Sequence, residues 1–226
     1  MKTIKALGFE EPIGSWTHLL GALAVVVLLI WLFRKGGAGR RHPLPIFIYG
    51  LSCIFLLSMS GVYHILPRET SARYVLRILD HAGIFILISG TITSVHLLLF
   101  SGFMRWGIIG IASIIATIGI ILSAMYMSIV PDIVTHIIYL VFGWLGVVSI
   151  VGLLKLRKAI VIKYLIYGGI AYSVGAVIDL LGFPVLVAGV LGAHELFHFA
   201  VLLGAAFHWV FLLKAIQTVE ATSTNK

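Results

Sequence analysis

Residues 106–127 read WGIIGIASIIATIGIILSAMYM, a run of 22 residues that contains no charged side chain. An α-helix needs about 20 predominantly apolar residues to cross the hydrocarbon core of a bilayer. The run begins directly after Arg105 and stops shortly before Pro131 and Asp132, so charge and proline mark its ends. This stretch therefore predicts a transmembrane helix.

The same pattern occurs six more times along the chain. Each run is apolar, and charged residues, glycine or proline separate it from the next. The seven expected spans lie at residues 16–33, 44–65, 79–100, 106–127, 133–154, 161–181 and 191–213. The runs are continuous rather than alternating, which excludes the short strands of a transmembrane barrel. The sequence thus predicts an all-α integral membrane protein, a bundle of seven transmembrane helices.

The composition supports this class and excludes several others. Of the 226 residues, 61% are hydrophobic and only 11% are charged, whereas a soluble domain has about 25% charged residues. Residues outside the spans suffice only for tails and short connections, so we expect a single domain over residues 1–226. The one cysteine, Cys53, excludes a disulfide-stapled fold. The 24 glycines suit a bundle whose helices approach closely.

Basic residues are unevenly divided between the two ends of the expected bundle. Eleven of the 16 Lys and Arg residues fall on the side of the C-terminus, and five fall on the side of the N-terminus. The positive-inside rule then places the C-terminus in the cytoplasm. In a chain this apolar, the net charge of +8 sets orientation rather than nucleic-acid binding. Seven of the eight acids and six of the nine histidines lie on the N-terminal side.

The most specific pattern is HELFH at residues 194–198, at the start of the seventh span. Its two histidines are four residues apart, which puts both on one face of a helix, one turn apart. This spacing can hold one metal ion, and zinc prefers imidazole ligands. A third ligand must come from another helix, and His64 is expected at the same depth. Ser60 shares the helix face of His64, and Asp80 opens the third span at that depth.

Two other interpretations of residues 194–198 stay open. HELFH matches the H-E-x-x-H pattern of zinc metalloproteases, in which Glu195 would be the general base and Asp179 a third ligand. Alternatively, the two histidines make structural hydrogen bonds without a metal. Ionisable groups within spans are energetically unfavourable and usually mark a cavity or a functional site. Their accumulation at one end of the bundle favours a site.

Four segments together resemble the hemolysin III family, the bacterial branch of the progestin and adiponectin receptor family. The segments are EPIGSWTH at 11–18, SGVYH at 60–64, Asp80-His81, and the pair His194 and His198. The resemblance implies a protein of the bacterial cell membrane in which His64, His194 and His198 bind zinc. It also implies that Asp80 holds a water molecule at the site and that Ser60 is the serine of the second-span motif. The adiponectin-receptor relatives have the opposite orientation, with the N-terminus in the cytoplasm.

The resemblance and the residues together predict a zinc-dependent hydrolase of a lipid or amide substrate. Receptor relatives of this family have ceramidase-like activity, which implies an amide-linked lipid. Zinc with three protein ligands lowers the pKa of water toward ~7 and so supplies a nucleophile at neutral pH. Asp80 would orient that water or accept its proton, and Ser60 would donate a hydrogen bond to the oxyanion. Membrane lipids are the expected partners, with substrate chains lying between helices.

Other functions are compatible with the same sequence. In one, zinc is structural and joins the second, third and seventh helices of a non-enzymatic regulator of membrane lipids. A channel or transporter would also use buried carboxylates and histidines, and the family name suggests a cytolysin. A retinal-binding pump is excluded because the seventh span has no lysine before Lys214.

Overall fold

The computed structural model describes residues 9–155 and 159–224 of the chain. Within these ranges the regular elements are helices, and Val187 and Leu191 form an isolated bridge before the last of these helices. The helices are α1 (Pro12–Lys35), α2 (Ala38–Arg41), α3 (Pro43–Tyr63), α4 (Ser71–Leu99), α5 (Gly102–Tyr126), α6 (Asp132–Trp144), α7 (Gly146–Lys155), α8 (Ala159–Leu181) and α9 (Ala193–Thr224).

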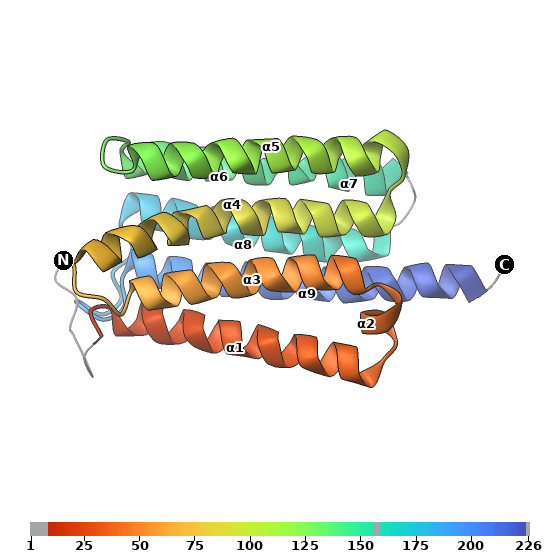
Figure 1. Ribbon diagram of the computed structural model, residues 1–226, viewed down its shortest axis with the longest axis horizontal. Coiled ribbons are helices and arrows are strands. Elements are labelled where there is room, and N and C mark those ends of the chain that lie inside the picture. The colour runs from red at the N-terminus through yellow and green to blue at the C-terminus, as the bar shows by residue number, and fades with distance from the viewer. Residues whose placement is uncertain (1–8, 156–158, 225–226) are drawn as a thin grey trace.

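Seven segments of the described chain are long and apolar enough to cross a membrane, with α6 and α7 together forming one of them. Figure 1 shows α1, α3, α4 and α5 side by side in chain order, with the remaining long helices behind them. The helices run in alternating directions, and the two chain ends lie at opposite ends of the bundle. The predicted seven-helix class is therefore confirmed.

The start of the third span was predicted too late. The helix α4 begins at Ser71 rather than at residue 79, and Thr70 caps it by accepting a hydrogen bond from the Arg73 amide at 3.2 Å. Two arginines in its first turns interrupt the apolar run, yet both are paired: Arg73 with Glu11 and Arg77 with Asp132. As a result, Asp80 lies in the third turn of α4 and does not open the helix.

The fifth span was predicted as one continuous helix, but it is broken near its middle. The helix α6 ends at Trp144 and α7 begins at Gly146. Tight turn hydrogen bonds join the Leu145 amide to the Phe142 carbonyl and the Val148 amide to the Leu145 carbonyl. Glycine has a low helix propensity, and Gly146 lies directly at this break. The seventh span also differs, because α9 continues eleven residues past the predicted end at residue 213.

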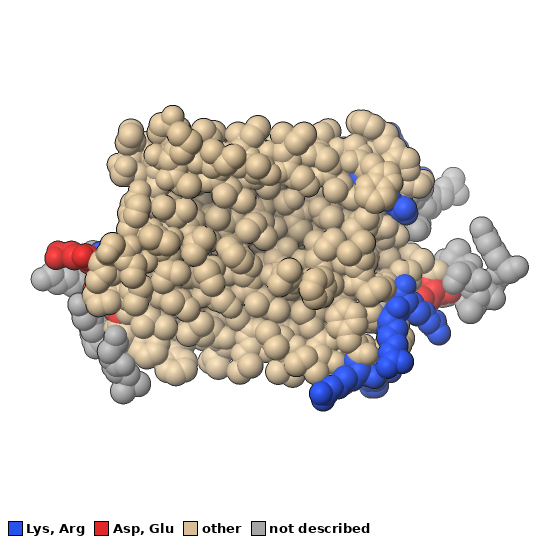
Figure 2. Space-filling model, in the orientation of Figure 1, with Lys and Arg blue, Asp and Glu red and all other residues tan. Residues whose placement is uncertain are grey.

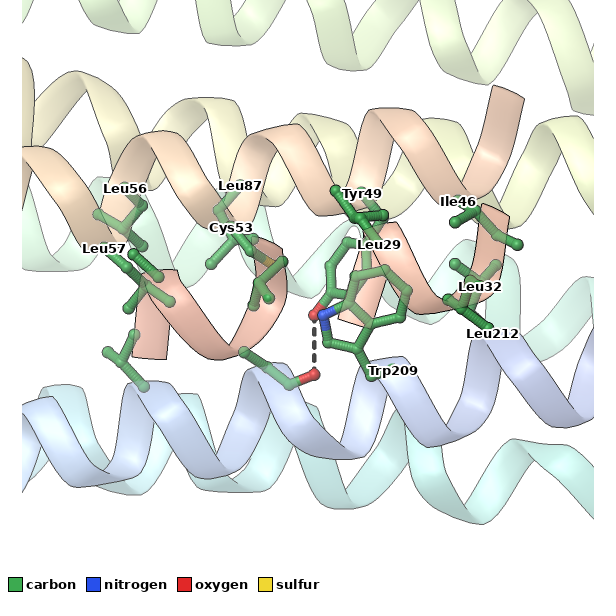
Figure 3. Close-up of a cluster of buried hydrophobic side chains, with 14 of the residues drawn as sticks. Leu29, Leu32, Ile46, Tyr49, Cys53, Leu56, Leu57, Leu87, Trp209 and Leu212 are labelled. Atoms are coloured by element: carbon green, nitrogen blue, oxygen red, sulfur yellow. Dashed lines mark hydrogen bonds between the residues drawn. The ribbon is translucent and has the colours of Figure 1, made fainter. Parts of the chain in front are cut away.

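The largest of three buried apolar clusters in the described chain lies where α1, α3 and α9 meet. Figure 3 shows its leucines packed around Tyr49 and Trp209, whose rings meet edge to face at 5.0 Å. The Tyr49 hydroxyl donates a hydrogen bond of 2.9 Å to the Ala205 carbonyl on α9. Elsewhere α4 packs directly on α3, because a Cβ added at Gly83 would lie 2.9 Å from the Leu56 Cα. Such close contacts through small residues are characteristic of membrane bundles.

The outer surface is apolar between two charged ends. Figure 2 shows Lys, Arg, Asp and Glu near the ends of the molecule, with uncharged residues between them. Large apolar side chains such as Leu23, Ile114 and Val141 are exposed on the outward faces of their helices. A soluble monomer rarely exposes more than a few hundred Å² of contiguous apolar surface. This surface therefore suits contact with lipid chains.

Candidate metal centre

Three imidazoles meet at the end of the bundle where α3 ends and α9 begins. His64 is the C-terminal cap residue of α3, and His194 and His198 lie in the first two turns of α9. The Nε2 atom of His194 is 3.4 Å from that of His64 and 3.2 Å from that of His198. One ligand atom from each residue lies within 4.8 Å of the others. The structure thus brings the three predicted ligands together.

The spacing of these nitrogens fits a single zinc ion. Two nitrogens that each lie 2.0–2.1 Å from one tetrahedral zinc are about 3.3 Å apart. The two Nε2 distances, 3.4 Å and 3.2 Å, lie on either side of this value. Imidazole is also a preferred ligand type for zinc. The residues present therefore fit the metal that the family resemblance implies.

A carboxylate lies behind each of two of these rings. The Nδ1 atom of His64 is hydrogen-bonded to Glu11 Oε2, and the Nδ1 atom of His194 lies 3.1 Å from Asp179 Oδ1. An ionised carboxylate only accepts hydrogen bonds, so each Nδ1 carries the proton. In a neutral ring the Nε2 lone pair then faces the cluster. This carboxylate–histidine arrangement is the usual one behind metal-binding histidines.

These carboxylates were not predicted in this role. Glu11 begins the quoted segment at residues 11–18, but its function was not assigned. Asp179 was considered only as a third ligand of a metalloprotease, whereas it lies behind His194, on the Nδ1 side of the ring. Their position in the sequence could have indicated this role, because both acids lie near the ends of spans at the N-terminal end of the bundle, at the depth of the three histidines.

Glu11 is held firmly by charge and by the backbone. Its carboxylate binds Arg68 at 3.0 Å and Arg73 at 2.9 Å, and its amide donates to the His64 carbonyl at 3.0 Å. Burial alone raises the pKa of Glu11, but the hydrogen bond from His64 and the charges of His64, Arg73 and His194 outweigh burial and lower the pKa to about 2. Glu11 is therefore ionised and fixed against His64.

Asp179 links a further histidine, His136, to the cluster. Its Oδ2 atom lies 3.0 Å from His136 Nε2, while His136 Nδ1 lies 2.7 Å from the Asp132 carbonyl oxygen. The carboxylate of α8 thus connects α6 with the start of α9. This network holds the His194 ring from the side away from the cluster.

The helix α1 packs against the other side of the cluster. The ring of His18 stacks on that of His198 with centroids 3.9 Å apart. Both ring nitrogens of His18 and the Ser15 hydroxyl are buried without a hydrogen-bond partner in the described structure. A Cβ added at Gly14 would lie 3.1 Å from His198 Cε1, so glycine permits this close approach. His18 ends the motif at residues 11–18, and its contact with the cluster was not predicted.

The two predicted catalytic residues, Ser60 and Asp80, lie near the cluster. Among the described residues, neither side chain forms a hydrogen bond with the three histidines. Ser60 is buried one turn before His64 on α3. Asp80 is half-buried on α4, close enough to His194 to act on it electrostatically. In the described part of the chain, the nearby arginines pair with Glu11 and Asp132 rather than with Asp80.

Glu195 is placed differently from the general base of a metalloprotease. Its Oε2 atom accepts a hydrogen bond of 2.8 Å from the Gly192 amide, just before α9 begins. This contact satisfies a backbone donor at the helix start, as acidic residues in the first turn commonly do. The carboxylate is therefore occupied at the helix terminus, which disfavours the metalloprotease interpretation.

Comparison with known proteins gives a consistent result. The family model described as Haemolysin-III related matches residues 8–209. Hemolysin-3 of Bacillus cereus is 31% identical over 170 residues, which cover 74% of this chain and 77% of that protein. The Hemolysin-3 homolog of Bacillus subtilis (strain 168) is 30% identical over 181 residues, covering 78% of this chain and 81% of that protein.

A shorter similarity extends to animal receptors. Membrane progestin receptor beta of Mus musculus is 35% identical over 79 residues, which cover 33% of this chain and 22% of that protein. The Bacillus relatives, by contrast, are matched over most of their length. Because the family match also spans most of the chain, this multi-pass membrane protein belongs to the haemolysin-III-related family.

Proposed function

We propose that the chain is a zinc-dependent hydrolase that acts on an amide-linked lipid in the bacterial cell membrane. The observation that carries the proposal is the meeting of His64 and His194. In both rings the carboxylate contact occupies Nδ1, so the two Nε2 atoms face each other at 3.4 Å. In the neutral rings each Nε2 atom carries a lone pair that can bind a metal ion. One zinc ion bound by both nitrogens would use these two lone pairs.

The number of ligands favours a catalytic rather than a structural metal. Structural zinc sites have four protein ligands, while catalytic sites have three and an open position. Among the residues that the structure describes, the cluster contains three such groups. Zinc in this position would supply a Lewis acid and activate water near neutral pH.

The remaining chemistry is assigned to two side chains of α3 and α4. Asp80, which is half-buried on α4 at this end of the bundle, would accept the proton of the attacking water. Ser60, buried one turn from His64, would donate a hydrogen bond to the oxyanion of the substrate. Arg73 and Glu11 would hold the His64 ring in place throughout.

A cavity inside the bundle supports a lipid as the substrate. It has a volume of about 390 Å³ and is lined mainly by apolar side chains of α4, α6, α7, α8 and α9. His136, which is hydrogen-bonded to Asp179, contributes to its wall. The cavity therefore begins next to the residues that hold His194. An acyl chain would lie there while its amide group faces the three histidines.

The proposed orientation follows the distribution of charge. Figure 2 shows Lys and Arg gathered near the end that carries the C-terminus, away from the histidine cluster. The positive-inside rule assigns this end to the cytoplasm. The metal centre would then face the outside of the cell membrane.

Metal analysis and lipid hydrolysis on the purified protein test the proposal. We expect about one zinc per chain and release of fatty acid from a long-chain ceramide, both abolished in a His194→Ala, His198→Ala double variant. His42→Gln is the control, because His42 precedes α3 at the opposite end of the bundle and its side chain makes no capping hydrogen bond. Zinc that remains stoichiometric in the double variant would refute the site. Zinc binding with no turnover of amide lipids would instead support a structural metal in a lipid regulator.

A further inference from the structure

A hydrogen-bonded pair of one histidine and one serine lies toward the opposite end of the bundle. His96 is in the last turn of α4, and its Nε2 atom is 2.8 Å from the Ser149 hydroxyl oxygen on α7. Both side chains are buried, with exposed fractions of 0% and 2%. The pair lies toward the end where α4 meets α5, whereas the three metal-centre histidines lie where α3 ends.

The hydrogen bonds of His96 decide which ring nitrogen carries the proton. Its Nδ1 atom contacts the backbone carbonyl oxygen of Met104 on α5. A carbonyl oxygen only accepts, so Nδ1 is the donor and carries the proton. In the neutral ring Nε2 then has a free lone pair, and the Ser149 hydroxyl donates to it. This is the order of nucleophile, base and orienting group that activates a serine.

Neighbouring residues fix the imidazole in this orientation. The ring of Phe100 stacks on that of His96 with centroids 4.6 Å apart and planes inclined by 23°. The Phe100 carbonyl in turn accepts a hydrogen bond of 2.6 Å from Arg105 Nε. The base is therefore held by three helices and a stacked ring, with little freedom to rotate.

Ser149 differs from ordinary serines in membrane helices. Such side chains usually donate to the carbonyl one turn earlier, as Ser52 does to Ile48 and Thr91 does to Leu87, both at 2.7 Å. Ser149 instead bonds a histidine from another helix. A serine that only requires a hydrogen-bond acceptor can use a carbonyl of its own helix, whereas Ser149 uses the side chain of a histidine.

The position of Ser149 gives it access to a ligand. Ser149 lines the apolar cavity of about 390 Å³ described above, while His96 is not among the lining residues. The serine therefore stands between its base and the cavity. The volume falls within the ~300–1,000 Å³ usual for small-molecule sites. A largely apolar wall that includes the Ser149 hydroxyl suits an acyl chain that carries a carbonyl group.

We propose that Ser149 is a nucleophile that accepts an acyl group from a long-chain carboxylic ester, with His96 as its base. The serine oxygen attacks the ester carbonyl carbon while its proton passes to His96 Nε2. The new oxygen–carbon bond forms, the bond to the departing alkoxide breaks, and His96 returns the proton to give the free alcohol. Water then cleaves the acyl-serine in the same manner and releases the fatty acid. This activity requires no metal and goes beyond the hydrolase proposed for the histidine cluster.

Labelling with an alkyl fluorophosphonate tests the nucleophile directly. In this reaction the serine oxygen bonds to phosphorus, fluoride leaves, and the proton is taken up by the base. The full-length protein in lipid nanodiscs is incubated with a dodecyl fluorophosphonate and analysed by intact mass and peptide mapping. We expect one adduct, located on Ser149, and its loss in Ser149→Ala. Ser52→Ala is the control, because Ser52 is a buried serine of α3 that donates to the Ile48 carbonyl and is not among the residues that line the cavity, and this variant should label as the wild type does.

The role of the base has its own measurement. General-base assistance contributes about 10²–10⁴-fold, so labelling of Ser149 should be at least ~100-fold slower in His96→Gln. A wild-type protein with no adduct on Ser149, or with equal labelling of another serine, would overturn the proposal. An unchanged labelling rate in a folded His96→Gln would overturn it as well. If that variant does not fold, the wild-type labelling pattern decides the question.

Hydrolysis of a long-chain p-nitrophenyl ester separates this site from the metal centre. We expect this activity to disappear in Ser149→Ala and to persist in the His194→Ala, His198→Ala double variant and after treatment with a chelator. Ester hydrolysis that disappears with the metal would refute the serine site. Amide-lipid hydrolysis that fails while labelling of Ser149 succeeds would instead refute only the metal-dependent function.

Discussion

Replacing Asp179 by asparagine tests whether the carboxylate behind His194 tunes the metal centre. The change keeps the size of the side chain but removes its charge and converts one oxygen into a donor. Asp179 accepts hydrogen bonds from His194 and from His136 through its two separate oxygens. An asparagine amide can satisfy one of these contacts as an acceptor but not both. The His194 ring therefore loses either its partner or its fixed orientation.

The expected size of the effect follows from this contact. Removing the group that orients a metal-binding histidine typically weakens metal affinity by about 10–100-fold. This range corresponds to about 1.4–2.8 kcal/mol of binding free energy. The three ligand nitrogens themselves are unchanged, so zinc at saturating concentration should still bind with a stoichiometry of one.

Competition with a chromophoric chelator at pH 7 measures the zinc dissociation constant of each variant. Asp132→Asn is the matched control, since this aspartate lies at the same end of the bundle, with its side chain 70% exposed and paired with Arg77. An exposed pair of this kind contributes little, and zinc affinity should stay within about twofold. Wild-type affinity in Asp179→Asn would refute the supporting role. Complete loss of zinc at saturation would show that Asp179 is a direct ligand.

Three further predictions concern catalysis, orientation and packing. Asp80→Asn should keep its zinc but lose amide-lipid hydrolysis, and unchanged turnover in this variant would remove Asp80 from the mechanism. A reporter that works only in the cytoplasm should be active when fused after Lys226, whereas activity of an externally folding reporter would reverse the orientation. Gly83→Ala should lower stability by about 1–3 kcal/mol in thermal unfolding, because its Cβ would meet Leu56. Gly110→Ala, with no atom within 4 Å of the added Cβ, should leave stability unchanged or higher.

The number and order of the transmembrane helices could be predicted because apolar length alone determines which segments cross a membrane. The start of α4 could not, since Arg73 looks like the end of an apolar run. Only the contact with Glu11, 62 positions earlier, makes this arginine acceptable inside a helix. The break at Leu145 could not be predicted either. Glycines are frequent throughout the chain, so the two that flank this turn do not distinguish it from other parts of the spans.

The meeting of His64 with the HELFH histidines could be predicted from depth, because alternating spans bring the end of the second to the start of the seventh. The residues behind the rings could not. Glu11 precedes the first span, and Asp179 comes from the end of the sixth, so neither shares a local pattern with the histidine it supports. Depth narrows the candidates to one end of the bundle, but which carboxylate contacts which ring depends on how the helices are rotated.

The origin of the three imidazoles has a consequence for biogenesis. One comes from the second span and two come from the last, and the carboxylate behind His64 precedes the first span. A nascent chain halted before α9 therefore contains only one of the three. Loading of the proposed zinc ion would follow insertion of the final helix, and a truncated or stalled chain would be left without the ion. Acquisition of the ion would thus report that translation and insertion have been completed.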